Sequence, residues 1–205
     1  MLIKRFNSYN PEMSVRANFP TLIFDGRKKF IMPILPQYHT TLLPDSKLKR
    51  GEVIDLVENL PHRYALQKVY ITFSPEGSAA PGDLILFYRI GPKDENKTYS
   101  SVISTVGVVD ELITSFKTKE EYLNHCQNRS VFTDQELERF WTNHRRNLKI
   151  LKFIYVDTLS KKPTLKDLWD MKVLEFPNGP RPFTPISDAQ FKDILKASNT
   201  HVNFI

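Results

Sequence analysis

The chain has 205 residues, 40% of them hydrophobic, so it can bury one good core and fits one domain, or one domain with an appended segment. Its single cysteine, Cys126, excludes an intrachain disulfide and a zinc site built from thiolates. No apolar run is long enough to cross a membrane, and no apolar signal-peptide core follows the first residues. These features predict a cytoplasmic protein with no membrane partner.

The net charge of +6 is distributed unevenly along the chain. Residues 1–50 contain nine Lys and Arg against three Asp and Glu, whereas residues 51–150 contain 12 against 14. A basic surface is typical of proteins that bind nucleic acid, because neutralising phosphates releases counterions. It also serves solubility, so net charge alone does not decide between the two interpretations.

The N-terminal region reads as a separate basic segment. Residues 19–24 and 29–32 are apolar runs separated by Asp25-Gly26, a dipeptide that favours a hairpin turn. We therefore assign residues 1–30 as an N-terminal basic segment or hairpin, which could be the tail of an upstream domain. Residues 31–205 form the main domain in this division.

The next segments mix stiff and ambiguous stretches. Pro33, Pro36 and Pro44 predict an extended path that crosses a surface rather than filling a core. Residues 48–60 have an ambiguous pattern with some helical character, and residues 68–73 alternate as a strand does.

A central hairpin organises the rest of the chain. Pro81-Gly82-Asp83 favours a tight turn, and residues 84–90 and 99–110 are apolar or β-branched runs that we pair as antiparallel strands. Gly107 inside the second run predicts a bulge or bend, which lets a sheet curl.

Helices are predicted from their start signals. Capping patterns begin at Thr118, Thr133 and Ser187, each with Glu or Gln three residues later, and a further helix begins at Thr164. The run 150–156 lies between the second and third of these helices and predicts another strand.

The order of these elements resembles a known superfamily. The run from Pro81 to Arg89, followed by Ser101 to Val109, resembles the core of PUA-like domains, which include the EVE, ASCH and YTH domains. The resemblance implies an α+β fold, a PUA-like small mixed β-barrel (pseudobarrel) with short helices on its rim. In several branches, the cleft of this barrel receives a nucleobase or a stretch of RNA or modified DNA.

A narrower resemblance concerns four shorter segments. Residues 33–45, 61–63, 131–137 and 181–187 resemble the EVE-like module that follows GNAT acetyltransferase domains in some bacterial proteins. No loop of the kind that holds acetyl-CoA pyrophosphate is found, so the sequence contains no complete acetyltransferase.

A cleft that reads a base needs aromatic faces, hydrogen-bonding groups and cations for the flanking phosphates. Trp141 and Phe183 also suit lids of the core, and either Arg89 or Arg181 also suits a surface ion pair. The candidate nucleic-acid-binding residues are Tyr38, His39, His62, Arg63, Tyr88, Arg89, Trp141, Arg181, Phe183 and Thr184.

Catalytic patterns have little support in this sequence. His125 and Cys126 are adjacent on a predicted helix and point about 100° apart, which prevents an intimate thiolate pair. The five histidines lack paired metal-ligand spacing, and no Gly-rich phosphate loop is found. The sequence therefore predicts no cofactor and no metal, and a hydrolase centred on His62 is the last of three hypotheses.

The leading hypothesis is a non-enzymatic module that recognises RNA or a modified nucleobase in a barrel-mouth cleft, with nucleic acid as its partner. The alternative is an accessory or regulatory domain of a GNAT acetyltransferase system, which acts through protein contacts.

Overall fold

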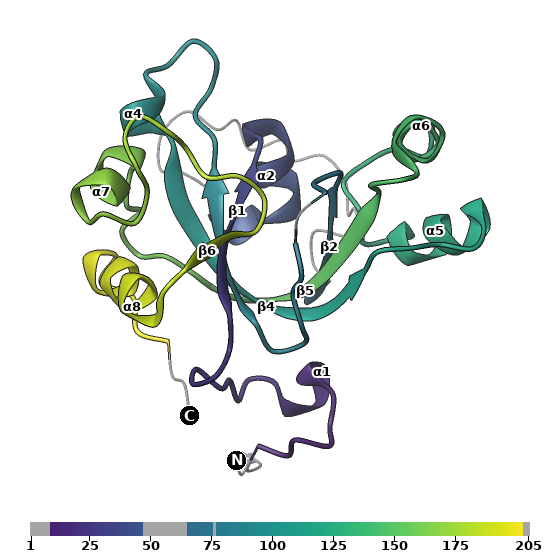
Figure 1. Cartoon of the computed structure of the whole chain (residues 1–205), viewed down its shortest axis with the longest axis horizontal. Coiled ribbons are helices and arrows are strands. Elements are labelled where there is room, and N and C mark those ends of the chain that lie inside the picture. Colours follow the sequence, from purple (N-terminus) through teal and green to yellow (C-terminus); the bar gives the residue numbers. More distant parts are fainter. Residues whose placement is uncertain (1–8, 47–64, 76, 203–205) are drawn as a thin grey trace.

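The computed structural model describes residues 9–46, 65–75 and 77–202. Its centre is a six-stranded mixed sheet with the strand order β2-β5-β4-β3-β1-β6 (Figure 1). All neighbouring strands are antiparallel except β1 and β3, which are parallel. The strands are β1 (Lys29–Ile34), β2 (Gln67–Thr72), β3 (Leu84–Arg89), β4 (Val102–Ile113), β5 (Lys149–Thr158) and β6 (Thr184–Ile186).

Short helices surround the sheet. Figure 1 shows α4, α7 and α8 grouped near one end of the sheet and α5 and α6 near the other. The helices are α1 (Val15–Asn18), α2 (Pro36–Leu42), the 3-10 helix η1 (Pro44–Ser46), α4 (Lys97–Ser100), α5 (Lys119–Cys126), α6 (Asp134–His144), α7 (Leu165–Asp170) and α8 (Asp188–Ala197). Within the described residues, no helix has the length and apolar character of a membrane span. The predicted α+β fold is confirmed.

The central hairpin is confirmed, although residues 99 and 100 of the predicted second strand belong to α4. Strands β3 and β4 pair antiparallel from Leu84 opposite Val108 to Arg89 opposite Val102. The register between β4 and β5 shifts at Val106/Gly107, so the predicted irregularity is there. A Cβ at Gly107 would lie 3.1 Å from the Phe153 ring, which explains why a glycine fits this position.

Both faces of the sheet are buried. Leu84, Leu86 and Tyr88 of β3 pack into the cluster that includes residues of α7 and α8. The alternate residues Ile85 and Phe87 pack into a second cluster, which includes Leu42 of α2. Since the side chains of a strand alternate, one covered face would bury only every other residue. Two covered faces explain why Phe87 and Tyr88 are both buried.

The predicted capping residues begin helices. Thr133, Thr164 and Ser187 each accept a hydrogen bond from a first-turn backbone N–H, and the partner side chain reaches back to the cap. Thr118 also accepts from the Glu121 N–H, but the Glu121 carboxylate accepts from the Lys117 N–H instead. All four predicted helices are confirmed.

Two expectations for the N-terminal part of the chain are wrong. The expected hairpin around Asp25-Gly26 is wrong, because β1 pairs with β3 and β6 rather than with residues 19–24. The extended path through Pro36 is also wrong: Pro36 is the first residue of α2, where its missing N–H costs nothing. Helix α2 buries Leu42 instead of crossing a surface. The ambiguous stretch 48–60 lies outside the described residues, and the division at residue 30 stays a prediction.

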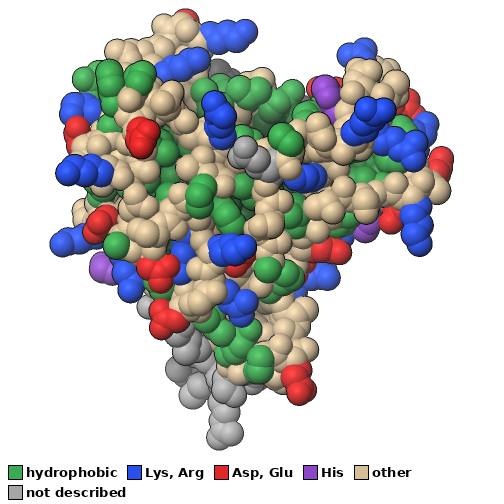
Figure 2. All heavy atoms as spheres, viewed as in Figure 1, with side chains coloured by type: hydrophobic (Ala, Val, Ile, Leu, Met, Phe, Trp, Pro, Cys, Tyr) green, Lys and Arg blue, Asp and Glu red, His purple; other side chains and the backbone are tan. Residues whose placement is uncertain are grey.

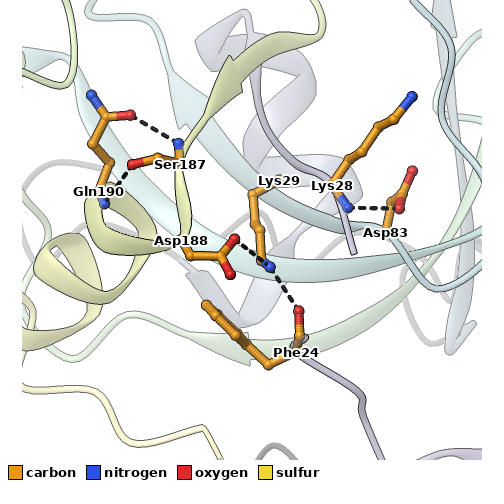
Figure 3. Close-up of polar contacts among 7 residues, drawn as sticks. All are labelled: Phe24, Lys28, Lys29, Asp83, Ser187, Asp188 and Gln190. Atoms are coloured by element: carbon orange, nitrogen blue, oxygen red, sulfur yellow. Dashed lines mark hydrogen bonds and ion pairs between the residues drawn. The ribbon is translucent and has the colours of Figure 1, made fainter. Parts of the chain in front are cut away.

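A buried lysine joins the start of β1 to the start of α8 (Figure 3). The Lys29 ammonium donates to the Asp188 carboxylate and to the Phe24 carbonyl, each at 2.7 Å, and lies 3.8 Å from the centre of the Phe24 ring. Beside it, the Lys28 N–H donates to Asp83 of the central turn. These contacts fix β1 against both its helical and its strand neighbours.

Candidate nucleic-acid interface

An apolar pocket of about 370 Å³ lies beside α2. Its walls come from β1, α2, β2 and α6 and from the segments next to them. The lining residues are Pro33, Ile34, Leu35, Tyr38, Leu42, Val69, Tyr70, Ile71, Phe73, Ile90, Val131, Phe132, Phe140 and Pro182.

Aromatic rings form a connected set along this pocket. Tyr38 lies 4.7 Å from Phe132, and Phe132 lies 4.9 Å from Phe140, between ring centres. Phe140 in turn lies 5.1 Å from Phe73. The Tyr70 hydroxyl donates to the Pro33 carbonyl at 2.6 Å, and burial raises the pKa of Tyr70. The pocket is therefore built by rings that hold one another in place.

A row of hydroxyl groups lies behind α2, on its sheet side. The His39 Nε2 atom is 2.8 Å from the Ser104 hydroxyl, which lies 3.1 Å from the Thr105 hydroxyl. Thr105 donates to Ser46 at 2.6 Å, and the Ser46 hydroxyl is 2.7 Å from that of Thr158. This polar row ties α2 and η1 to β4 and β5.

His39 is held neutral at the start of this row. Its side chain has no exposed surface, and its Nδ1 atom has no hydrogen-bond partner among the described residues. Burial, and then the positive charges of Arg89 and Lys162, lower the pKa of His39 from 6.5 to about 3. His39 is thus a neutral buried group that supports α2 rather than a cation that meets a phosphate.

The structure brings together only part of the predicted set. Tyr38 and Pro182, which follows Arg181, line the same pocket, and Arg181 is exposed. His39 and Arg89 are buried near each other behind α2.

The remaining candidates lie elsewhere. Tyr88 is in the core on the α7 and α8 side, where its burial raises its pKa. Trp141 stacks on Tyr122 at 5.8 Å, away from the pocket lining. Thr184 accepts from the Arg181 N–H and shapes that loop. His62 and Arg63 lie outside the described residues.

Phe183 is a buried anchor of the last loop. It packs edge-on to Phe30 at 5.9 Å, and only 6% of it is exposed. Gly77 has a φ of +117°, and a Cβ there would collide with the Phe183 ring. Phe183 therefore lies in the core. Of the two interpretations from the sequence, a base-binding ring or a lid of the core, its position agrees with the second.

The Gly77 contact gives a stability prediction. We expect Gly77→Ala to lower the free energy of unfolding by about 2 kcal/mol, because it adds both a left-handed backbone penalty and a collision with a buried ring. Gly26→Ala is the control, since Gly26 has a φ of +69° but open space around its Cβ position. Urea unfolding of both variants checks this, and equal losses would contradict the role of Phe183.

Several pocket residues escaped the sequence analysis. Tyr70, Phe73, Phe132 and Phe140 line the pocket, but they come from β2, from its end, and from the region before and within α6. Their hydrophobic character predicts core positions as well as pocket positions. Only the shared location of these segments beside α2 distinguishes the two roles.

Cys126 is poorly suited to act as a nucleophile. Burial raises the pKa of Cys126 to about 12, so its thiolate is strongly disfavoured at neutral pH. Its side chain is buried. In the described part of the chain, no three His, Cys, Asp or Glu side chains are grouped as metal ligands.

Comparisons with known proteins give a match in structure but not in sequence. No family model matches the chain, and no curated protein does. Two similar solved structures are the ASCH protein of Zymomonas mobilis and a serine-to-alanine variant of it, each 10% identical to this chain with a TM-score of 0.55. These matches cover 83% of this chain and 95% and 96% of those chains. Likeness at this level of identity shows the fold alone, and this fold agrees with the one that the resemblance of residues 81–109 implies. The chain therefore shares the fold of the ASCH protein of Zymomonas mobilis.

Proposed function

We propose that this chain is a non-enzymatic nucleic-acid-binding module that takes an unpaired or flipped-out base of RNA or modified DNA into the apolar pocket. The observation that carries the proposal is the connected set of aromatic rings along that pocket. Every base has a π face, and stacking of a base on an aromatic side chain contributes about 1–3 kcal/mol. A pocket of about 370 Å³ with such walls suits one base.

Two neighbouring features support this use of the pocket. Arg181 is exposed and directly precedes Pro182 of the lining, so the chain carries a cation next to the pocket wall. Tyr38 is half-buried on α2, which is itself fixed by Leu42 in the core and by His39 in the polar row. A preformed aromatic face loses little conformational entropy when a base stacks on it.

The test is binding of fluorescein-labelled mixed-sequence single-stranded RNA and DNA, measured by fluorescence anisotropy at low salt. We expect Tyr38→Ala to weaken binding about tenfold, since loss of one stacking partner of about 1.4 kcal/mol corresponds to that factor. Tyr99→Ala is the matched control, because Tyr99 is 60% exposed on α4 and does not line the pocket. Its affinity should stay unchanged. Absence of binding by the unmodified chain, or equal effects of the two variants, would refute the proposal.

The second candidate function is an accessory domain of a GNAT acetyltransferase system. Leu35 at the pocket is 45% exposed, and apolar walls also accept an apolar side chain of a protein partner. Co-purification with a GNAT acetyltransferase that survives nuclease treatment and is lost in Leu35→Asp would favour this candidate. Binding to oligonucleotides with no such association would exclude it.

A further inference from the structure

We infer that Arg139 and Arg146, near the outer surface of α6, hold the phosphates of the single-stranded nucleic acid whose base enters the pocket. The inference rests on the proposed function, and it adds the path that the strand takes over the surface. That strand passes over the mouth of the pocket, with Arg181 on one side and the end of α6 on the other.

A basic stretch begins in the second half of α6 and continues into β5. From Arg139 to Val156 the sequence has no Asp or Glu, and it contains five Lys and Arg. Three of these cations have contacts within the molecule. Lys152 pairs with Glu111 at 2.8 Å, Lys149 donates to the Pro75 carbonyl, and Arg145 lies over the Trp141 ring.

Among the described residues, Arg139 and Arg146 have no such contact. Both are exposed, and no ion pair joins either of them to another residue in the described ranges. Arg139 lies in the middle of α6, and Arg146 lies two residues after its last residue, in the turn that follows. Arginines on the second half of this helix and on the turn after it suit phosphates of one strand.

This part of α6 borders the pocket directly. Phe140, which follows Arg139, lines the pocket, and His144 four residues later stacks on Phe73 of the same lining at 4.3 Å and 27°. Figure 2 shows Lys and Arg side chains, with Asp and Glu side chains among them, over the end of the molecule that α5 and α6 form. A strand with one base in the pocket would therefore meet these cations next.

Within the described residues, most cations of the basic N-terminal quarter are engaged or buried. Arg16 pairs with Asp110 at 3.2 Å, Arg27 donates to Tyr9 and to the Pro81 carbonyl, and Lys29 is buried, whereas Lys28 is exposed. The exposed position of Arg139 is also not explained by a favourable interaction with the α6 dipole. That effect is confined to the last turn of a helix, and Arg139 lies in the middle of α6.

The test is the salt dependence of binding to the same labelled single-stranded oligonucleotides. The variant combines Arg139→Gln with Arg146→Gln in the full chain. We expect the plot of log affinity against log salt to become less steep by about 1.4, because each lost phosphate contact contributes about 0.7 for single strands. The control replaces Lys93 and Lys97 with Gln. Both are exposed, at or near α4 and outside the pocket lining, and their loss removes the same charge.

The outcomes separate this inference from the function on which it rests. A reduced slope in the arginine variant, with a normal slope in the lysine variant, supports the strand path over α6. If the unmodified chain binds and Tyr38→Ala weakens binding, but the arginine variant keeps the full slope, the path over α6 is wrong and the base pocket stands. If the unmodified chain does not bind at low salt, the proposed function fails, and the strand path fails with it.

Discussion

Replacing Asp188 with asparagine is expected to lower the free energy of unfolding by about 2–3 kcal/mol, because it leaves the Lys29 charge without its counterion. The side chain of Lys29 is only 1% exposed, and in the variant the groups around its ammonium are all neutral: the Phe24 carbonyl, the face of the Phe24 ring and the new amide. Loss of one partner from a fully buried pair costs about 3–5 kcal/mol. We expect less here, since the Asp188 side chain is 55% exposed and water screens that end of the pair.

Urea unfolding of the variant measures this effect. Asp193→Asn is the matched control, because Asp193 is exposed on the same helix and has no ion pair with any other described residue. Its stability should change by less than about 0.5 kcal/mol. If both variants lose the same stability, the contact between β1 and α8 does not contribute as the geometry of Figure 3 indicates.

The second large effect is a loss of stability in acid that depends on His39. Burial lowers the pKa of His39 in the folded chain to about 3, compared with 6.5 in the unfolded chain. As the pH falls below 6.5, the unfolded chain therefore takes up this proton first. The stabilisation is fully present above pH 6.5 and is lost progressively as the pH falls towards 3. Between about pH 7 and about pH 5, this one group should account for about 2 kcal/mol.

The measurement compares the free energy of unfolding at these two pH values in each variant. His39→Gln removes the titrating group and leaves an amide that can bond to Ser104, so the difference between the two pH values should shrink by about 2 kcal/mol. His201→Gln is the control, because His201 is exposed near the end of the described chain. A full pH dependence in His39→Gln would show that His39 is not held neutral by the fold.

Local signals in the sequence account for much of the fold. The turn at Pro81-Gly82-Asp83 and the caps at Thr133 and Ser187 specify nearby backbone, so both the hairpin and the helices after these caps follow from a few residues. The parallel pairing of β1 with β3 has no local signal, because it joins residues more than 50 positions apart. The sequence therefore favoured a local hairpin partner for β1 that the structure does not have.

The pocket could be predicted only in part. Tyr38 was singled out from an expected extended segment, whereas the structure presents it from α2, which begins at a proline. Phe73, Phe132 and Phe140 lie in three separate segments, and their convergence depends on how those segments pack. The basic stretch after Arg139 was not noticed in the sequence, because the net charge was summed over residues 51–150. Within that range, the acidic residues in the first half of α6 offset the positive charge of the stretch.

The most direct measurement is ultraviolet crosslinking of a mixed-sequence single-stranded oligonucleotide to the full chain, with the modified peptides mapped by mass spectrometry. The account predicts crosslinks at Tyr38, Phe132 or Phe140, the rings along the pocket, and their loss when unlabelled competitor is added. Crosslinks confined to peptides of α7 and α8, or no crosslink at low salt, would contradict base binding in this pocket.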